Sequence, residues 1–129
     1  MALASPGNEE ILVGQGQNLV REKLYNQAQE VFERAVKLKP EDGDAWSGLA
    51  FAASENKEYK ITLDARSMRS KYLAETPVTY FLWATTYDSL HQSKQAQEYY
   101  RKFLTASDGK FPDQEWQAKH RLVALGGNH

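Results

Sequence analysis

The stretch NQAQEVFERAVKLKP, residues 26–40, shows the pattern that decides the fold. Its apolar residues recur at intervals of three and four, the spacing of one face of an α-helix. They are Ala28, Val31, Phe32, Ala35 and Leu38. Pro40 ends the run, because proline cannot continue a helix. The same spacing returns at residues 61–72 and 96–104, and no alternating stretch predicts a strand. The sequence therefore predicts an all-α protein.

Capping residues, glycines and prolines divide the chain into seven expected helices. Residues with short polar side chains stand where helices are expected to begin: Asn8, Asp44, Thr76 and Asp113. Such side chains accept hydrogen bonds from the free backbone N–H groups of a helix start. Gly126 and Gly127 are expected to close the last helix. The expected helices cover residues 9–22, 26–39, 44–55, 58–75, 77–90, 93–106 and 113–125.

The chain resembles itself at a spacing of 34 residues. Large residues recur at this interval at Leu12, Trp46 and Tyr80, and small residues at Gly16, Ala50 and Ala84. Twice the interval separates Ala28 from Ala96 and Phe32 from Tyr100. A small residue beside a large one lets two antiparallel helices approach closely. A fixed period of this length is typical of stacked helical repeats.

These residues resemble the tetratricopeptide repeat (TPR), which combines a Trp, Leu, Gly and Tyr run with Ala, Phe and a closing Pro. The first expected repeat, residues 9–42, keeps Gly16, Tyr25, Ala28, Phe32, Ala35 and Pro40. The second, residues 43–76, keeps Trp46, Leu49, Ala50 and Tyr59. The third, residues 77–110, keeps Ala84, Tyr87, Leu90, Ala96 and Tyr100, with Tyr80 in the Trp position.

The resemblance implies an architecture as well as a repeat. It implies a right-handed superhelical α-solenoid, in which helix-turn-helix repeats stack and the first helix of each repeat lines a concave side. Residues 1–8 are expected to be an N-terminal leader. Residues 111–129 are expected to hold a capping helix and a C-terminal tail.

The second expected repeat departs from the TPR pattern, because Thr62 and Arg66 stand at its Ala and Phe positions. The favoured interpretation is a helix that is longer or rotated by about one residue, with Ile61, Ala65 and Met68 in the core. Burying Arg66 unpaired would cost far more. The other interpretation is a helix that presents basic residues to an anionic partner. These residues are Lys57, Lys60, Arg66, Arg69 and Lys71.

Composition and motifs argue against catalysis and cofactors. The chain has no Cys, which excludes thiolate zinc sites, disulfides and cysteine nucleophiles. His91, His120 and His129 are the three histidines, and they are expected in a turn, on a helix and at the chain end. The sequence holds no metalloprotease, serine-hydrolase or phosphate-loop motif. We therefore predict no catalytic residue, no metal site and no cofactor.

Charge and hydropathy limit the partners. Lys and Arg number 16 and Asp and Glu number 17, a net charge of −1 that gives no reason to expect nucleic acid. The longest compact apolar stretch, residues 49–53, is far shorter than the roughly 20 residues of a membrane helix. No signal peptide is visible in residues 1–7. The compartment stays open, with the cytoplasm slightly favoured.

The TPR resemblance implies a peptide groove lined by the first helix of each repeat. Carried onto this sequence, the groove residues are Val13, Gln17, Val20, Ser47, Phe51, Ser54, Phe81, Thr85 and Asp88. Chaperone-binding members clamp a terminal carboxylate with Lys and Asn, and the matching positions here lack both, so no such clamp is predicted. Val13, Phe51 and Phe81 give apolar centres that suit an amphipathic helix or an extended peptide. The alternative is that Phe51 or Phe81 packs inside the array.

The sequence thus predicts a non-enzymatic interaction module that binds a peptide or helix of an unidentified partner protein. One alternative is self-association, or a fragment of a longer TPR array, because arrays that are cut expose apolar ends. A weaker hypothesis is that the basic residues of segment 57–71 bind an acidic partner.

Overall fold

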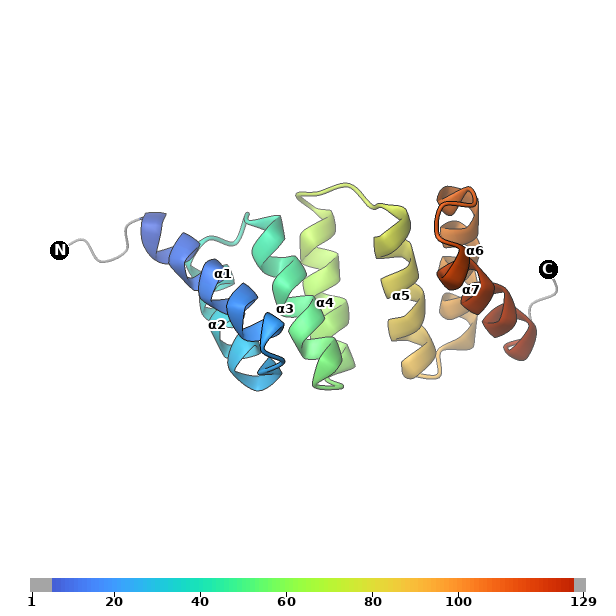
Figure 1. Cartoon of the computed structure of the whole chain (residues 1–129), viewed down its shortest axis with the longest axis horizontal. Helices are drawn as coiled ribbons and strands as arrows, with labels where there is room; N and C mark the ends of the chain where they lie inside the picture. The colour runs from blue at the N-terminus through green and yellow to red at the C-terminus, as the bar shows by residue number, and fades with distance from the viewer. Residues whose placement is uncertain (1–5, 127–129) are drawn as a thin grey trace. The chain divides into compact units, whose positions relative to one another are not determined.

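The computed structural model describes residues 6–126, and these form seven α-helices and no strand (Figure 1). The helices are α1 (Pro6–Arg21), α2 (Tyr25–Leu38), α3 (Gly43–Glu55), α4 (Tyr59–Ser70), α5 (Pro77–Ser89), α6 (Ser93–Ser107) and α7 (Pro112–Ala124). The all-α prediction is confirmed. The fourth helix ends earlier than expected, at Ser70 rather than at residue 75.

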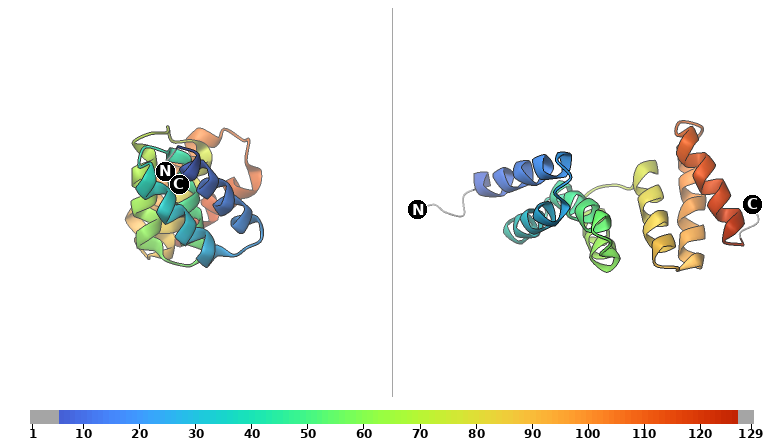
Figure 2. Two further views of the ribbon diagram at one scale, coloured as in Figure 1. Left: turned by 90° about the vertical axis from the view of Figure 1, so that its left-hand side faces the viewer. Right: turned by 60° about the horizontal axis from the view of Figure 1, so that its bottom comes forward.

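The helices fall into two units. Residues 1–74 hold α1 to α4, and residues 75–129 hold α5 to α7. In the first unit α1 packs on α2, α2 on α3, and α3 on α4. In the second unit α6 lies against both α5 and α7, as Figures 1 and 2 show. Each unit has a hydrophobic core of its own.

Three helix-to-helix turns share one backbone conformation at intervals of 34 residues. Lys23, Lys57 and His91 have φ values of 62°, 63° and 59°, in the left-handed region. After each of them a backbone N–H reaches back five residues, from Leu24 to Leu19 at 2.9 Å and from Glu58 to Ala53 at 2.8 Å. The third turn repeats this bond between residues 92 and 87 at 2.9 Å. Such bonds satisfy carbonyls at a helix end.

The helix starts agree in part with the predicted caps. Thr76 caps α5 as predicted, and it forms a reciprocal capping box with Thr79 at N···O distances of 2.7 and 3.2 Å. The cap of α3 is Asp42 rather than Asp44, and its carboxylate accepts from the N–H groups of Asp44 and Ala45. Asp44 therefore lies in the first turn, where the helix dipole still favours an acidic residue.

Two other predicted caps lie inside helices. Asn8 lies within α1, because that helix begins at Pro6. Asp113 lies in the first turn of α7, because Pro112 occupies the first helical position, for which its φ is already suited. At the end of α7, Gly126 has a φ of +88°, as a closing glycine requires, while Gly127 and the leader's residues 1–5 lie outside the described residues.

The core of the first unit corrects the expectation for α4. Thr62 is 0% exposed and Arg66 is 4% exposed, so both occupy the interior positions that the repeat assigns to them. Ala65 is buried and Ile61 packs against the core as expected. The prediction that Arg66 faces solvent is therefore wrong. The Thr62 hydroxyl donates to the Glu58 carbonyl at 3.0 Å, which removes the cost of burying it.

The core of the second unit is rich in aromatic residues. Tyr100 and Phe103 of α6 are buried, together with Leu122 of α7. The rings of Trp83 and Tyr99 stack with their centroids 5.4 Å apart. Because α7 contributes a buried leucine, this helix is part of the second core and does not merely cover it.

Candidate functional site

A pocket of about 430 Å³ lies in the first unit between α1, α2 and α3. Its lining residues are Gln17, Val20 and Arg21 of α1, Phe32 of α2, and Asp44, Ser47, Gly48 and Phe51 of α3. Four of the predicted groove residues, Gln17, Val20, Ser47 and Phe51, are among them. The pocket thus joins two first helices of neighbouring expected repeats, which are separated by 34 residues in the sequence.

Two glycines flank the ring of Phe32, which lines the pocket. A Cβ atom on Gly16 would lie 2.6 Å from this ring, and a Cβ atom on Gly48 would lie 2.4 Å from it. A side chain at either position would overlap the ring. Helices α1 and α3 therefore contact the Phe32 ring through their backbones at these two glycines. Sequence reasoning found Gly16 from the 34-residue interval and missed Gly48. The available signal was a glycine in the middle of an otherwise regular helix.

Phe51 is the exposed apolar residue of this pocket. Its side chain is 39% exposed, and its ring meets the ring of Tyr25 edge to face, with centroids 6.1 Å apart. This contact holds the ring, and part of the side chain stays exposed. The alternative that Phe51 packs inside the array does not fit this exposure.

Polar groups surround this apolar surface. The Ser47 hydroxyl accepts a hydrogen bond from Arg69 Nε at 2.8 Å, and Arg69 also donates to the Ala74 carbonyl at 3.2 Å. Arg21 donates to Asn18 of its own helix. Arg21 and Asp44 bring one charge of each sign to the pocket.

Two of the predicted groove residues of the first unit do not line the pocket. Val13 is half-buried and packs against the core of the first unit. Ser54 is half-buried one turn beyond Phe51.

The other three predicted groove residues meet in a separate pocket of about 280 Å³ in the second unit. Phe81, Thr85 and Asp88 line it together with Ser89, Tyr100, Gln117 and Arg121. Phe81 is half-buried, and its ring centroid lies 5.1 Å from that of Phe103. Phe81 therefore serves the core of the second unit as well as its surface.

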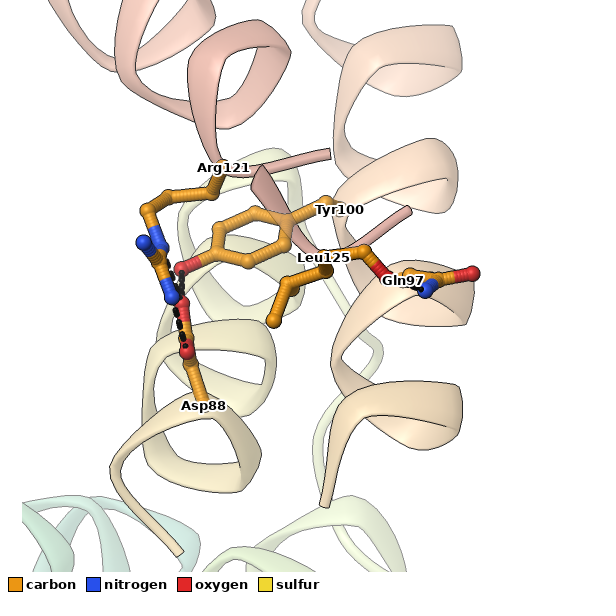
Figure 3. Close-up of polar contacts among 5 residues, drawn as sticks. All are labelled: Asp88, Gln97, Tyr100, Arg121 and Leu125. Atoms are coloured by element: carbon orange, nitrogen blue, oxygen red, sulfur yellow. Dashed lines mark hydrogen bonds and ion pairs between the residues drawn. The ribbon is translucent and has the colours of Figure 1, made fainter. Parts of the chain in front are cut away.

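Asp88 is engaged by two side chains of its own unit (Figure 3). Arg121 of α7 donates to both carboxylate oxygens, from Nε at 2.7 Å and from Nη2 at 2.8 Å. The hydroxyl of buried Tyr100 donates to Asp88 Oδ2 at 2.8 Å. The hydrogen bond from Arg121 lowers the pKa of Asp88, although burial works in the opposite direction. Burial and the bond to Asp88 raise the pKa of Tyr100.

A second contact ties the end of α7 to α6 (Figure 3). Gln97 Nε2 donates to the backbone carbonyl of Leu125 at 2.6 Å. Together with the pair of Asp88 and Arg121, this bond holds the C-terminal half of α7 against the unit. The surface of the second pocket is thus already occupied by side chains that satisfy one another.

A family model for the tetratricopeptide repeat matches residues 9–42 and 78–108, together half of the sequence. The chain belongs to the tetratricopeptide repeat family. The predicted resemblance is confirmed. The model leaves out the stretch in which Thr62 and Arg66 replace the usual Ala and Phe.

Solved structures with the same fold share little sequence with this TPR chain. The type III secretion chaperone SycD of Yersinia enterocolitica, in complex with a peptide of the translocator YopD, is 18% identical, with a TM-score of 0.80 and 95% of each chain covered. PcrH, in complex with the chaperone-binding region of PopD, is 18% identical, with a TM-score of 0.78, and the match covers 95% of this chain and 93% of PcrH.

YrrB, a TPR protein with an unusual peptide-binding site, is 16% identical, with a TM-score of 0.76. The match covers 89% of this chain and 59% of YrrB, so the chain spans about three fifths of that protein. No curated protein sequence matches the chain. These likenesses show the fold, and they confirm the predicted α-solenoid class.

The five basic residues of segment 57–71 are not gathered into one exposed patch on this TPR chain. Lys57, Lys60 and Lys71 are exposed, whereas Arg66 is buried and Arg69 is half-buried and bonded to Ser47. The patch was the alternative interpretation of this segment, drawn from the number of basic residues, and the interior position of Arg66 does not fit it.

Two further kinds of site are absent from residues 6–126. In that part of the chain no group of three or more His, Asp or Glu side chains is placed to hold a metal ion. Likewise, no helix within this range is long and apolar enough to cross a membrane.

Proposed function

We propose that this chain is a non-enzymatic interaction module that binds a peptide or helical segment of a partner protein in the pocket between α1, α2 and α3. The observation that carries the proposal is the partly exposed ring of Phe51 beside Phe32, on a pocket of about 430 Å³. Gly48 keeps this surface open because it adds no side chain above the Phe32 ring. Aromatic anchors in a partly open pocket are typical of interface hot spots.

The similar structures support the proposal. SycD and PcrH are each solved with a segment of a translocator protein, and YrrB is described by its peptide-binding site. The ligand expected here is a segment that places an apolar side chain against Val20 and Phe51, with polar or charged residues on either side that meet Arg21 and Asp44.

The division into repeats at residues 9–42, 43–76 and 77–110 belongs to this proposal, with residues 1–8 as a leader and 111–129 as a capping helix and tail. The turns at Lys23, Lys57 and His91 support it, because they share one conformation at the same interval. They include the second repeat, which the family model does not match.

The proposal is tested with peptides selected from a random phage-displayed library against the whole chain. Phe51→Ala is expected to weaken binding of a selected peptide by about 1–3 kcal/mol, roughly 5- to 150-fold in Kd, with unchanged circular dichroism. The matched control is Leu38→Ala, since Leu38 is 50% exposed on α2 and lies outside the pocket. Equal losses in the two variants, or none in Phe51→Ala, would contradict the proposal.

A second candidate function, self-association, rests on the outer face of α7. Trp116 is 61% exposed and Val123 is 73% exposed, seven residues apart and therefore on one face of the helix. His120 stacks on the Trp116 ring with centroids 3.8 Å apart. Light scattering over a concentration series tests this function, and a constant monomer mass would remove it.

A further inference from the structure

Glu9 is a buried acid at the start of α1. Its side chain is 3% exposed, although glutamate is rarely found in an interior without a partner. Among residues 6–126, Glu9 Oε2 is buried and has no hydrogen-bond partner. A buried oxygen without a donor is costly, so the environment favours the protonated acid.

The group that faces Glu9 is the carboxylate of Asp42. Asp42 caps α3 and accepts from the backbone N–H groups of Asp44 at 2.9 Å and Ala45 at 3.3 Å. The N–H groups and the dipole of the helix start favour the ionised form of Asp42, so this cap offers an acceptor and no proton. The hydrogen bond between the two side chains therefore requires the proton to lie on Glu9.

The titration of the two acids follows from this arrangement. Burial, followed by the hydrogen bond to Asp42, raises the pKa of Glu9 to about 7. Burial works to raise the pKa of Asp42 as well, but the bonds from Glu9, Ala45 and Asp44 outweigh it and hold that pKa below its ordinary value. The other charges that act on Glu9 are Lys39, which lowers its pKa, and Glu10, which raises it.

We propose that Glu9 and Asp42 form a proton-dependent clasp that fastens the start of α1 to the start of α3. In the closed clasp the Glu9 hydroxyl donates to the Asp42 carboxylate. When Glu9 releases its proton to solvent, two carboxylates face each other in a poorly solvated place, and their repulsion loosens α1. The clasp joins the two helices that supply most of the lining of the pocket of about 430 Å³.

The direction of the pH dependence follows from the raised pKa of Glu9. The stability that this group contributes is fully present below its unfolded pKa of 4.5 and is lost as the pH rises to about 7. Each pKa unit corresponds to a tenfold change in an equilibrium constant, so the opening of α1 is expected to rise by up to about 300-fold over this window.

Two measurements on the whole chain test the clasp without any peptide. Carbon-13 NMR titration of the Glu9 carboxyl is expected to give a midpoint near 7. Asp42→Asn, which keeps the cap's acceptor and removes its charge, is expected to shift that midpoint towards 4.5. A wild-type midpoint below 5 would overturn the proposal.

Hydrogen exchange gives the second readout. Protection of α1 amides, corrected for intrinsic exchange, is expected to fall between pH 5 and pH 8 in the wild type. In Glu9→Gln the protection of the α1 amides is expected not to change with pH, because the glutamine amide donates to Asp42 at every pH. The matched control is Glu10→Gln, an exposed neighbour that should keep the wild-type dependence. The proposal is overturned if Glu9→Gln and Glu10→Gln behave alike.

The clasp also has a consequence that rests on the proposed function. A peptide that binds the first pocket should bind the wild type more weakly at pH 8 than at pH 5.5, and Glu9→Gln equally at both. Failure to find any peptide would count against the proposed function, whereas the NMR and exchange results would still decide the clasp.

Discussion

The ring of Phe32 occupies the space that a side chain on Gly48 would need. We expect Gly48→Ala to destabilise the chain by about 1–3 kcal/mol, because the new Cβ would lie 2.4 Å from the ring and the buried ring cannot withdraw freely. Urea unfolding measures the change in the free energy of unfolding.

The control for this substitution is Gly14→Ala on α1. Nothing lies within 4 Å of a Cβ at Gly14, so alanine should stabilise the helix by about 0.5–1 kcal/mol. If both variants were stabilised alike, the close approach of α3 to Phe32 would be wrong.

Asp88 is the hydrogen-bond acceptor of the buried Tyr100 hydroxyl. Asp88→Ala removes the acceptor of Tyr100, whose side chain is 2% exposed, and we expect a loss of about 1–3 kcal/mol in the free energy of unfolding. Glu98→Ala is the control, since its pair with Lys102 is exposed and should contribute less than about 1 kcal/mol. Thermal unfolding of the two variants checks the difference.

The pKa of Asp88 adds a pH dependence to this prediction. Because Arg121 lowers that pKa, the stabilisation is present above the ordinary value of 3.8 and is lost as the pH falls through the lower folded value. Below pH 3.8 the free energy of unfolding of Asp88→Ala should therefore fall less steeply with pH than that of the wild type. If the two proteins lost stability equally at low pH, the contribution assigned to the ionised Asp88 would be contradicted.

The turns between helices allow a prediction at the scale of the element. Lys57 has a φ of 63°, and a left-handed conformation costs a residue with a side chain roughly 1–2 kcal/mol relative to glycine. We expect Lys57→Gly to stabilise the chain, and Lys23→Gly to do so by a similar amount, since its φ is 62°.

Arg34→Gly is the control for the turn, because this exposed residue lies in the interior of α2. Glycine in a helix interior should destabilise by about 1 kcal/mol. Chemical denaturation distinguishes the two positions by the sign of the change. The same sign at both would show that the turn does not need its left-handed residue.

Most of the elements could be predicted from the sequence, because the signals that define a helix are local. The spacing of Ala28, Phe32 and Ala35 and the Thr76-Pro77 start each depend on a few neighbouring residues. The cap of α3 was misplaced by two residues because Asp42 and Asp44 both offer a suitable carboxylate. Only the backbone conformation shows which of them caps the helix.

At the scale of the whole molecule, the number of basic residues in a segment does not predict how many of them are exposed. Of the five basic residues in segment 57–71, Lys57, Lys60 and Lys71 are exposed, while Arg66 is buried and Arg69 is directed to Ser47. We predict no saturable binding of a poly-glutamate peptide at about 150 mM salt, where charges are screened beyond about 8 Å. Fluorescence anisotropy measures it, and saturable binding that a Lys57→Glu, Lys60→Glu, Lys71→Glu variant abolishes would revive the acidic-partner hypothesis.

The candidate site could be predicted only in part. Gln17, Val20, Ser47 and Phe51 line the first pocket, because the period of 34 residues places them at equivalent positions on first helices. Asp88 was expected to face a ligand, but it meets Arg121, 33 residues later in the chain. No periodicity relates these two residues, so their pairing could not be read from either segment.

The sequence by itself determined the helices, the repeat interval and the family, because periodic burial and cap chemistry act within a few turns of one helix. The tertiary structure decided where the pocket opens, through Gly48 against Phe32, and which ionisable side chains are buried, namely Arg66 and Glu9. These features depend on which atoms meet across helices and how far water is excluded from them. The residue pattern of one segment does not predict which side chain of another segment will pack against it.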